Sequence, residues 1–121
     1  MLRTIRSENP ELVRTLLELK RAAKAHKAPV WGALADQLAR ARHQRTPVNV
    51  GHLERLTTAD ETVVVPGKVL ASGTLSKRLT VGAFHYSAEA RLKIHNAGGK
   101  ALTIDELVKS KPDGTGVRLL A

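Results

Sequence analysis

Cysteine is absent from the 121-residue chain, which excludes disulfide bonds, thiolate metal sites and cysteine nucleophiles. Long hydrophobic runs are absent as well, since no stretch of about 18 apolar residues is present that could cross a bilayer as a helix. The N-terminal segment MLRTIRSENPEL also lacks the apolar centre of a signal peptide. We therefore expect a cytoplasmic protein.

Aromatic residues are scarce, with one Trp, one Tyr and one Phe, so base stacking on rings is expected to contribute little.

Acidic residues are outnumbered: 11 Asp+Glu stand against 20 Lys+Arg, which gives a formal net charge of +9. A protein with this positive charge is attracted to a polyanion, and each phosphate that it neutralises releases counterions. Nucleic acid is thus the leading partner class. An anionic membrane surface is the rival, but it favours large apolar anchors that this chain lacks.

The remaining composition is that of a folded domain, with 42% hydrophobic and 26% charged residues. A chain of 121 residues argues for a single domain. We divide it into a basic arm over residues 1–7, a helical part over 8–45 and a mixed α/β core over 46–121.

Two helices are predicted near the N-terminus. Asn9 and Pro10 suit a helix start, and Pro29 ends this first helix and opens a second. Apolar residues recur at helical spacing in both segments, at Leu12, Leu16, Leu19 and Ala23 and then at Trp31, Leu34, Ala35 and Leu38. The place of Trp31 on this stripe favours a core role over base stacking.

The most basic stretch, residues 40–55, follows this helix pair. Its first part shows no apolar periodicity and carries Arg40, Arg42, His43 and Arg45. Guanidinium groups on an irregular, solvent-reaching segment can bind phosphates in bidentate fashion. The alternative is a solvated linker. Asn49 could satisfy nearby backbone or read a base edge.

Turn residues and β-branched runs alternate over residues 63–99. We expect a buried strand at Val63 to Val65, a turn at Pro66-Gly67, a second turn at Ser72-Gly73 and a strand from Leu79 to Tyr86. A helix capped by Ser87 and closed by Gly98 should follow.

The C-terminal part contains a second helix-start signal, because Thr103 and Glu106 stand in capping-box register for a helix through about Ser110. A final strand is expected over residues 117–120. The order of elements predicts an α/β fold of short strands interleaved with helices, preceded by an N-terminal helix pair.

Enzyme signatures are weak. Gly67-Lys68 and Gly73-Thr74 resemble parts of a P-loop, but the lysine follows the first glycine, so amides, ammonium and magnesium ligand would not converge. No histidine pairs with another at i, i+4 for zinc, and no Ser-His-acid spacing stands out; the histidines are His26, His43, His52, His85 and His95. We expect no catalytic residue, metal or cofactor.

A helix-turn-helix that reads duplex DNA is the alternative for the N-terminal helix pair. The second helix would have to expose a polar face to the major groove. Its residues away from the apolar stripe include Ala33, Asp36, Gln37 and Arg40, and a phosphate would repel the acid. A free-standing basic DNA- or RNA-binding regulator is therefore the second functional hypothesis.

Most of the chain, from about residue 8 to 121, resembles the archaeal and eukaryotic large-ribosomal-subunit protein eighteen-e family. Its second half also resembles the C-terminal part of bacterial large-subunit protein fifteen. The resemblance rests on Asn9-Pro10, Val30-Trp31, Val48-Asn49-Val50-Gly51 with Arg55, and above all VVVPGKVLASG from Val63 and LTVGAFHYSAEARLKIHNAGG from Leu79. One departure is Ala71, where a glycine is expected.

The resemblance implies a non-enzymatic constituent of the large ribosomal subunit that binds rRNA, with neighbouring ribosomal proteins as further partners and no small-molecule substrate. It also implies an irregular fold of repeated short strands and helices. Selectivity would come from RNA shape and single-stranded features. Our candidate RNA-binding residues are Lys20, Arg21, Lys24, Arg40, Arg42, His43, Arg45, Asn49, Arg55, Lys68, Lys77 and Arg78.

Replacement of Arg42 and Arg45 by alanine tests the basic segment. The double variant should bind RNA more weakly and show a flatter dependence of log K on log salt concentration, because it neutralises two fewer phosphates. Folding stability should change little. An unchanged salt slope in a filter-binding series would remove this segment from the interface.

Overall fold

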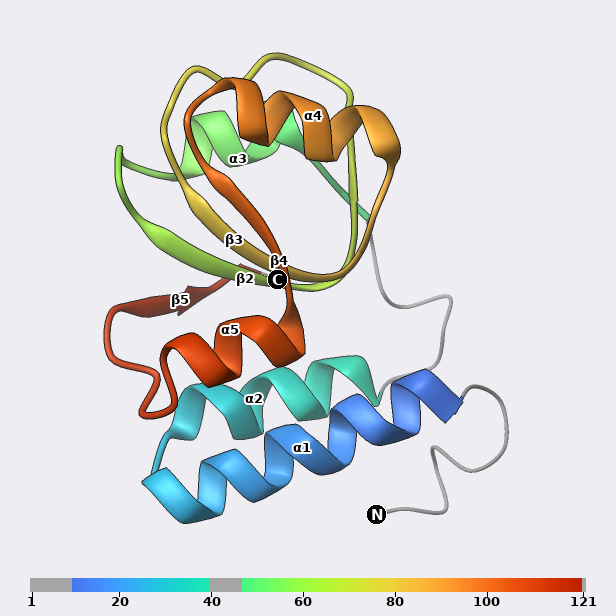
Figure 1. Cartoon of the computed structure of the whole chain (residues 1–121), viewed down its shortest axis with the longest axis vertical. Helices are drawn as coiled ribbons and strands as arrows, with labels where there is room; N and C mark the ends of the chain where they lie inside the picture. Colours follow the sequence, from blue (N-terminus) through green and yellow to red (C-terminus); the bar gives the residue numbers. More distant parts are fainter. Residues whose placement is uncertain (1–9, 40–46, 121) are drawn as a thin grey trace.

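The computed structural model describes residues 10–39 and 47–120 as a helix pair followed by short strands and helices (Figure 1). The helices are α1 (Pro10–His26), α2 (Pro29–Leu38), α3 (Val50–Leu56), α4 (Ala88–Asn96) and α5 (Ile104–Ser110). The strands are β1 (Val48–Asn49), β2 (Thr62–Leu70), β3 (Thr80–Tyr86), β4 (Lys100–Thr103) and β5 (Val117–Leu119). The predicted α/β fold with an N-terminal helix pair is confirmed.

The five strands form one sheet in which every pairing is parallel. Its order is β1-β2-β3-β4, and β5 also pairs with β2. Because β3 occupies one edge of β2, β1 and β5 share the other edge. The strand β5 pairs with Thr62 to Val64, and β1 pairs with Val69 and Leu70. The strand β2 is therefore the centre of the sheet.

Helices cover both faces of this sheet (Figure 1). The helices α3 and α4 lie on one face, while α2 and α5 pack on the other and α1 packs outside them. Two apolar cores result, one on each face. Val64 belongs to the core shared with α1, α2 and α5, whereas Val63 and Val65 belong to the core on the opposite face. All three valines are fully buried, as the uninterrupted apolar run predicts for a strand covered on both faces.

The expected turn at Pro66-Gly67 is wrong. The strand β2 continues through both residues, which are buried, and the pairing with β3 shifts register between Val65 and Lys68. On the edge of β2 away from β3, β5 pairs with Thr62 to Val64 and β1 pairs with Val69 and Leu70. Pro66 and Gly67 lie between these two paired stretches. A proline is tolerated there because it lacks only the N–H that would join a ladder.

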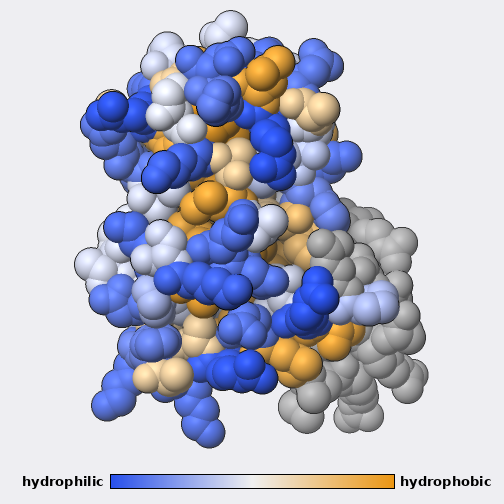
Figure 2. Space-filling view, viewed as in Figure 1, coloured by the Kyte–Doolittle hydropathy of each residue, from blue (hydrophilic) through white to orange (hydrophobic). Residues whose placement is uncertain are grey.

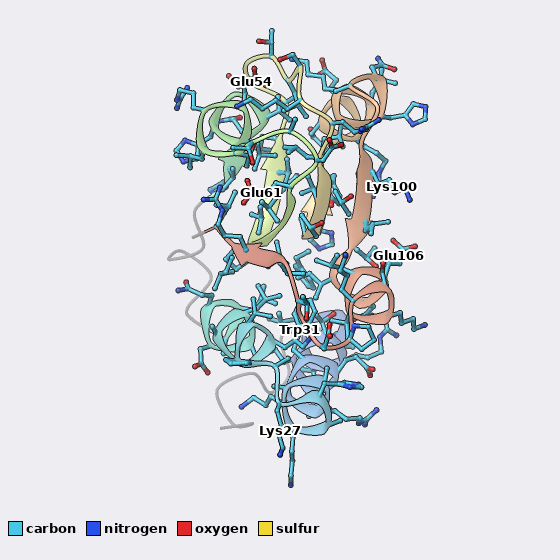
Figure 3. The ribbon with its side chains drawn as sticks, turned by 90° about the vertical axis from the view of Figure 1, so that its left-hand side faces the viewer. Lys27, Trp31, Glu54, Glu61, Lys100 and Glu106 are labelled. Atoms are coloured by element: carbon cyan, nitrogen blue, oxygen red, sulfur yellow. The ribbon has the colours of Figure 1, made fainter. Side chains whose placement is uncertain are left out.

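The N-terminal helix pair follows the predicted apolar stripes. Leu16, Leu19 and all four stripe residues of α2 are buried, while Ala23 is only partly buried. Trp31 has no exposed surface, which confirms its core role, and its Nε1–H donates to the carbonyl of Pro112 at 2.8 Å (Figure 3). This bond ties the 111–116 turn to the helix pair.

The helix ends also follow their sequence signals. The Ser87 hydroxyl accepts a hydrogen bond from the amide of Ala90 at 3.1 Å at the start of α4. The helix closes with Gly98 at φ +85°, where the amides of Gly98 and Gly99 donate back into the last turn. Thr103 and Glu106 form the predicted capping box at the start of α5. These local predictions are confirmed.

Two glycine backbones touch where the 71–79 loop crosses the start of α3. A Cβ built on Gly73, which has φ +93°, would lie 2.6 Å from the Cα of Gly51. The amide of Gly51 also donates to the carbonyl of Ser72 at 3.0 Å. The predicted turn at Ser72-Gly73 is confirmed, and it requires glycine for both its φ angle and its close approach.

Trp31→Phe should lower the free energy of unfolding by about 2 kcal/mol, because the variant cannot form the hydrogen bond to Pro112 and leaves unfilled core volume. Urea denaturation measures the change. Leu92→Ala is the control, since Leu92 is 57% exposed and its truncation should shift stability by no more than about 0.5 kcal/mol. Equal effects of the two substitutions would contradict this account.

Gly73→Ala should destabilise the protein by at least about 1 kcal/mol more than Gly116→Ala. Both glycines have positive φ angles, but a Cβ at Gly116 meets no atom within 4 Å, whereas one at Gly73 meets the Gly51 backbone. The pair therefore separates the steric contact from the backbone cost. Thermal and urea unfolding of the two variants provide the comparison, and identical losses of stability would show that the backbone around Gly51 relaxes freely.

Candidate nucleic-acid interface

The candidate RNA-binding residues divide between described and undescribed parts of the chain. Arg40, Arg42, His43 and Arg45 lie outside the described residues. The others lie on α1, on and around α3, and on β2, and they form separate surfaces rather than one site.

The first surface is on α1, the helix farthest from α3 (Figure 1). Lys20, Arg21 and Lys24 are all exposed. The Nη1 of Arg21 lies 3.4 Å from Oε1 of Glu18 in a surface pair, with the Arg21 side chain 74% exposed. Such a surface pair contributes little to folding stability, so Arg21 can readily leave Glu18 for another anion. This part of α1 thus offers cations to solvent.

The second surface surrounds the C-terminal end of α3. Arg55 is exposed, and its Nη2 lies 3.3 Å from Nδ1 of His52. The ammonium of Lys77 donates to the carbonyls of Glu54 at 2.6 Å and Thr57 at 2.5 Å. It thereby satisfies a carbonyl in the last turn of α3 and complements the helix dipole. Only one of its three N–H donors is left for a partner.

Arg78 stands beside this end of α3 and makes a two-way contact with Asp60. Its Nε donates to Oδ1 of Asp60 at 2.6 Å, and the amide of Asp60 donates to the carbonyl of Arg78 at 2.7 Å. The hydrogen bond and the charge of the guanidinium lower the pKa of Asp60, and the carboxylate raises the pKa of Arg78. Arg78 remains 66% exposed, so its terminal nitrogens still face solvent.

Asn49 and Lys68 lie near the opposite end of the sheet, where β1 pairs with β2. The Oδ1 of Asn49 accepts a hydrogen bond from the amide of Ser72 at 3.2 Å, so this oxygen serves the 71–79 loop. Lys68 is exposed and pairs in register with His85 of β3. The structure therefore gives Asn49 a structural contact and leaves the Lys68 side chain accessible.

Further charged contacts hold the 71–79 loop. The ammonium of Lys93 on α4 donates to the carbonyls of Ala71 at 2.6 Å and Gly73 at 2.7 Å. The Glu54 carboxylate accepts from the amide of Ser76 at 3.0 Å and from its hydroxyl at 2.8 Å, and these bonds lower the pKa of Glu54. Sequence reasoning missed both residues, because their partners lie about twenty positions away.

Ala71 does not require the glycine expected at its position. Lys27 and Asp60 are the only described residues other than glycine with positive φ. Ala71 therefore adopts an ordinary backbone conformation, and its carbonyl serves as an acceptor for Lys93.

The helix α2 is poorly placed to read duplex DNA. Its stripe of Trp31, Leu34, Ala35 and Leu38 is buried between α1 and the sheet, and its exposed residues include Ala33 and Asp36. A recognition helix needs an exposed polar face, which α2 lacks along most of its length.

Metal-ligating side chains do not cluster in residues 10–39 and 47–120. This part of the chain contains no group of three or more His, Cys, Asp or Glu side chains able to hold a metal ion. None of the described helices has the length and apolar character needed to cross a membrane.

Hydrophilic side chains cover much of the coloured surface in Figure 2, with apolar patches between them. The helices α1 and α3, which carry or adjoin these cations, lie on opposite sides of the sheet (Figure 1). This arrangement suits contact with a polyanion on several faces.

Comparison with known proteins identifies the family. A family model described as ribosomal protein 60S L18 and 50S L18e matches residues 3–121. The large ribosomal subunit protein eL18 of Methanopyrus kandleri is 44% identical over 117 residues, covering 93% of this chain and 92% of the relative. The proteins of that name from Halobacterium salinarum and Archaeoglobus fulgidus are 43% and 42% identical, covering 93% and 96% of this chain and 96% and 99% of the relatives.

These matches extend over nearly the whole chain, and they agree with the resemblance carried by the central motifs. The chain belongs to the family of ribosomal proteins 60S L18 and 50S L18e.

Proposed function

We propose that the chain is a structural, non-enzymatic constituent of the large ribosomal subunit in the cytoplasm, and that it binds rRNA and stabilises the rRNA fold during and after assembly. The observation that carries this proposal is membership of the family over residues 3–121. The net charge of +9 supports it, because an excess of cations on a chain of this size favours a polyanionic partner.

We assign the phosphate contacts to the two cationic surfaces and to Lys68, which lies near the opposite end of the sheet from Arg55 and Arg78. Arg55, Lys68 and Arg78 are exposed and supply cations from the sheet and from the end of α3. Lys20, Arg21 and Lys24 supply them from α1, on the other side of the sheet. Lys77 acts chiefly by holding the end of α3, with one N–H left for RNA. Asn49 acts by positioning the 71–79 loop.

The basic segment with Arg40, Arg42, His43 and Arg45 completes the proposed interface. We assign the whole chain to one rRNA-binding domain, with residues 1–7 as a basic arm. Two cationic surfaces on opposite sides of a sheet can neutralise phosphates from separate RNA elements, which would fix their relative positions. Neighbouring large-subunit proteins are the further partners.

Binding of the full-length chain to large-subunit rRNA fragments and to a length-matched DNA duplex, across a salt series, tests the function. Tight binding to a defined rRNA fragment should persist to higher salt than binding to DNA, because specific RNA contacts add to the electrostatic ones. Equal and steeply salt-sensitive binding to both would overturn the proposal in favour of a general nucleic-acid-binding protein.

The same series tests the assigned residues. Arg55→Gln combined with Lys68→Gln should weaken rRNA binding and reduce the slope of log K against log salt by about 0.7 to 0.9 for each phosphate that is no longer neutralised. Lys109→Gln combined with Lys111→Gln is the matched control, because it removes the same charge from the end of α5. Equal slopes for the two double variants would show that only net charge matters.

A further inference from the structure

The helix α4 carries apolar residues on two sides, and only one of them is covered by the protein. Ala90 and Ile94 point inward and are fully buried in the core between α4 and the sheet. Leu92 points outward and is 57% exposed, more than the other exposed large apolar residues in the described part of the chain, Leu56 and Leu17. An uncovered leucine is ordinary when isolated, but Leu92 is not isolated.

Leu92 lies in a groove of about 510 Å³ between α4 and β4. Ala88 and Leu92 contribute apolar surface from α4, and Ala101 and Leu102 contribute it from β4. The α4 residues share one helical face because they are four positions apart. The groove thus has an apolar floor that is open to solvent.

The rim of this groove is positively charged. Arg91 and His95 border it from α4. Lys100 borders it from the start of β4 (Figure 3). The Arg91 guanidinium lies 4.8 Å from the centre of the Tyr86 ring and donates to the carbonyl of Ala101 at 3.2 Å, so its position is fixed. The positive charge of Arg91, held at the rim, favours a partner with negative charge.

The edge of β4 is closed to an added strand. Among the described strands β4 pairs only with β3, but Arg91 already occupies the carbonyl of Ala101. The Glu106 side chain occupies the amide of Thr103 at 2.8 Å. A strand of four residues with these groups taken offers little to β-augmentation.

The floor suits an inserted side chain better than a nucleobase. It is formed by aliphatic residues, and the Tyr86 ring beside it is covered by Arg91. Base recognition relies on open ring or guanidinium faces and on polar groups that match base edges. Protein interfaces instead bury a bulky apolar anchor within a charged rim.

We propose that the groove between α4 and β4 docks a neighbouring protein, through a segment that places a bulky apolar side chain against Leu92 and carboxylates opposite Arg91, His95 and Lys100. The charge of the rim and the aliphatic floor define this occupant. The proposal rests on the proposed function, which places the chain among other proteins of the large subunit.

Photocrosslinking within assembled large subunits tests the groove. The full-length chain carrying Leu92→p-benzoylphenylalanine is incorporated, the subunits are isolated by sedimentation and irradiated, and the adduct is digested. We expect an adduct with a protein whose crosslinked segment carries carboxylates beside the attachment point. The same photoreactive residue at Leu56 is the control, because Leu56 is 47% exposed beside Arg55 and should label rRNA.

Charge reversal supplies the second measurement. His95→Glu together with Lys100→Glu should reduce the yield of the Leu92 adduct by about three- to ten-fold, because the favourable contact of Lys100 becomes repulsive and a second carboxylate enters the rim. The Leu56 adduct should keep its yield. An unchanged Leu92 yield would overturn the assignment of an acidic partner.

The remaining outcomes are distinct. An adduct of position 92 with rRNA or with a second copy of the chain, or no adduct in subunits that contain the protein, overturns the docking proposal alone. Failure of the unmodified chain to sediment with large subunits overturns the proposed function, and the docking proposal falls with it.

Discussion

The burial of β2 on both faces is the constraint on which the rest of the structure depends. Val63 and Val65 face α3 and α4, while Val64 faces the helices on the opposite side, so one strand joins two apolar cores. A parallel sheet needs such cover, because its crossover connections carry helices to its faces. The N-terminal helix pair meets the same need, since α2 packs on β2 and β5.

Much of this architecture follows from sequence because its signals are local. The apolar stripes of α1 and α2, the capping box of Thr103 with Glu106 and the closure of α4 at Gly98 all depend on residues within one or two helical turns. The error at Pro66-Gly67 has the opposite origin. Turn chemistry predicts a break there, but pairing with β3 on one edge and the gap between β5 and β1 on the other allow the strand to continue.

The candidate site was less predictable from the sequence, because it too depends on contacts between residues far apart in the chain. Sequence can count lysines but cannot tell which of them hold the fold. Lys77 was predicted to bind phosphate, yet two of its three donors serve carbonyls near the end of α3. Lys93 was not predicted at all, and it holds the 71–79 loop through carbonyls twenty or more positions away. A solvated cation and a structural one differ only in these long-range contacts.

The acidic residues complete the electrostatic argument. A carboxylate near a proposed RNA surface would repel phosphate, but those nearest α3 are paired within the protein. Asp60 accepts from Arg78, Glu61 pairs with Arg118 at 2.8 Å, and Glu54 accepts from Ser76. The first two pairs cancel charge close to where it arises, and they leave the exposed Arg55 to favour a phosphate at this end of α3. The contacts that connect the loops to the sheet therefore also favour the surface that the proposed function requires.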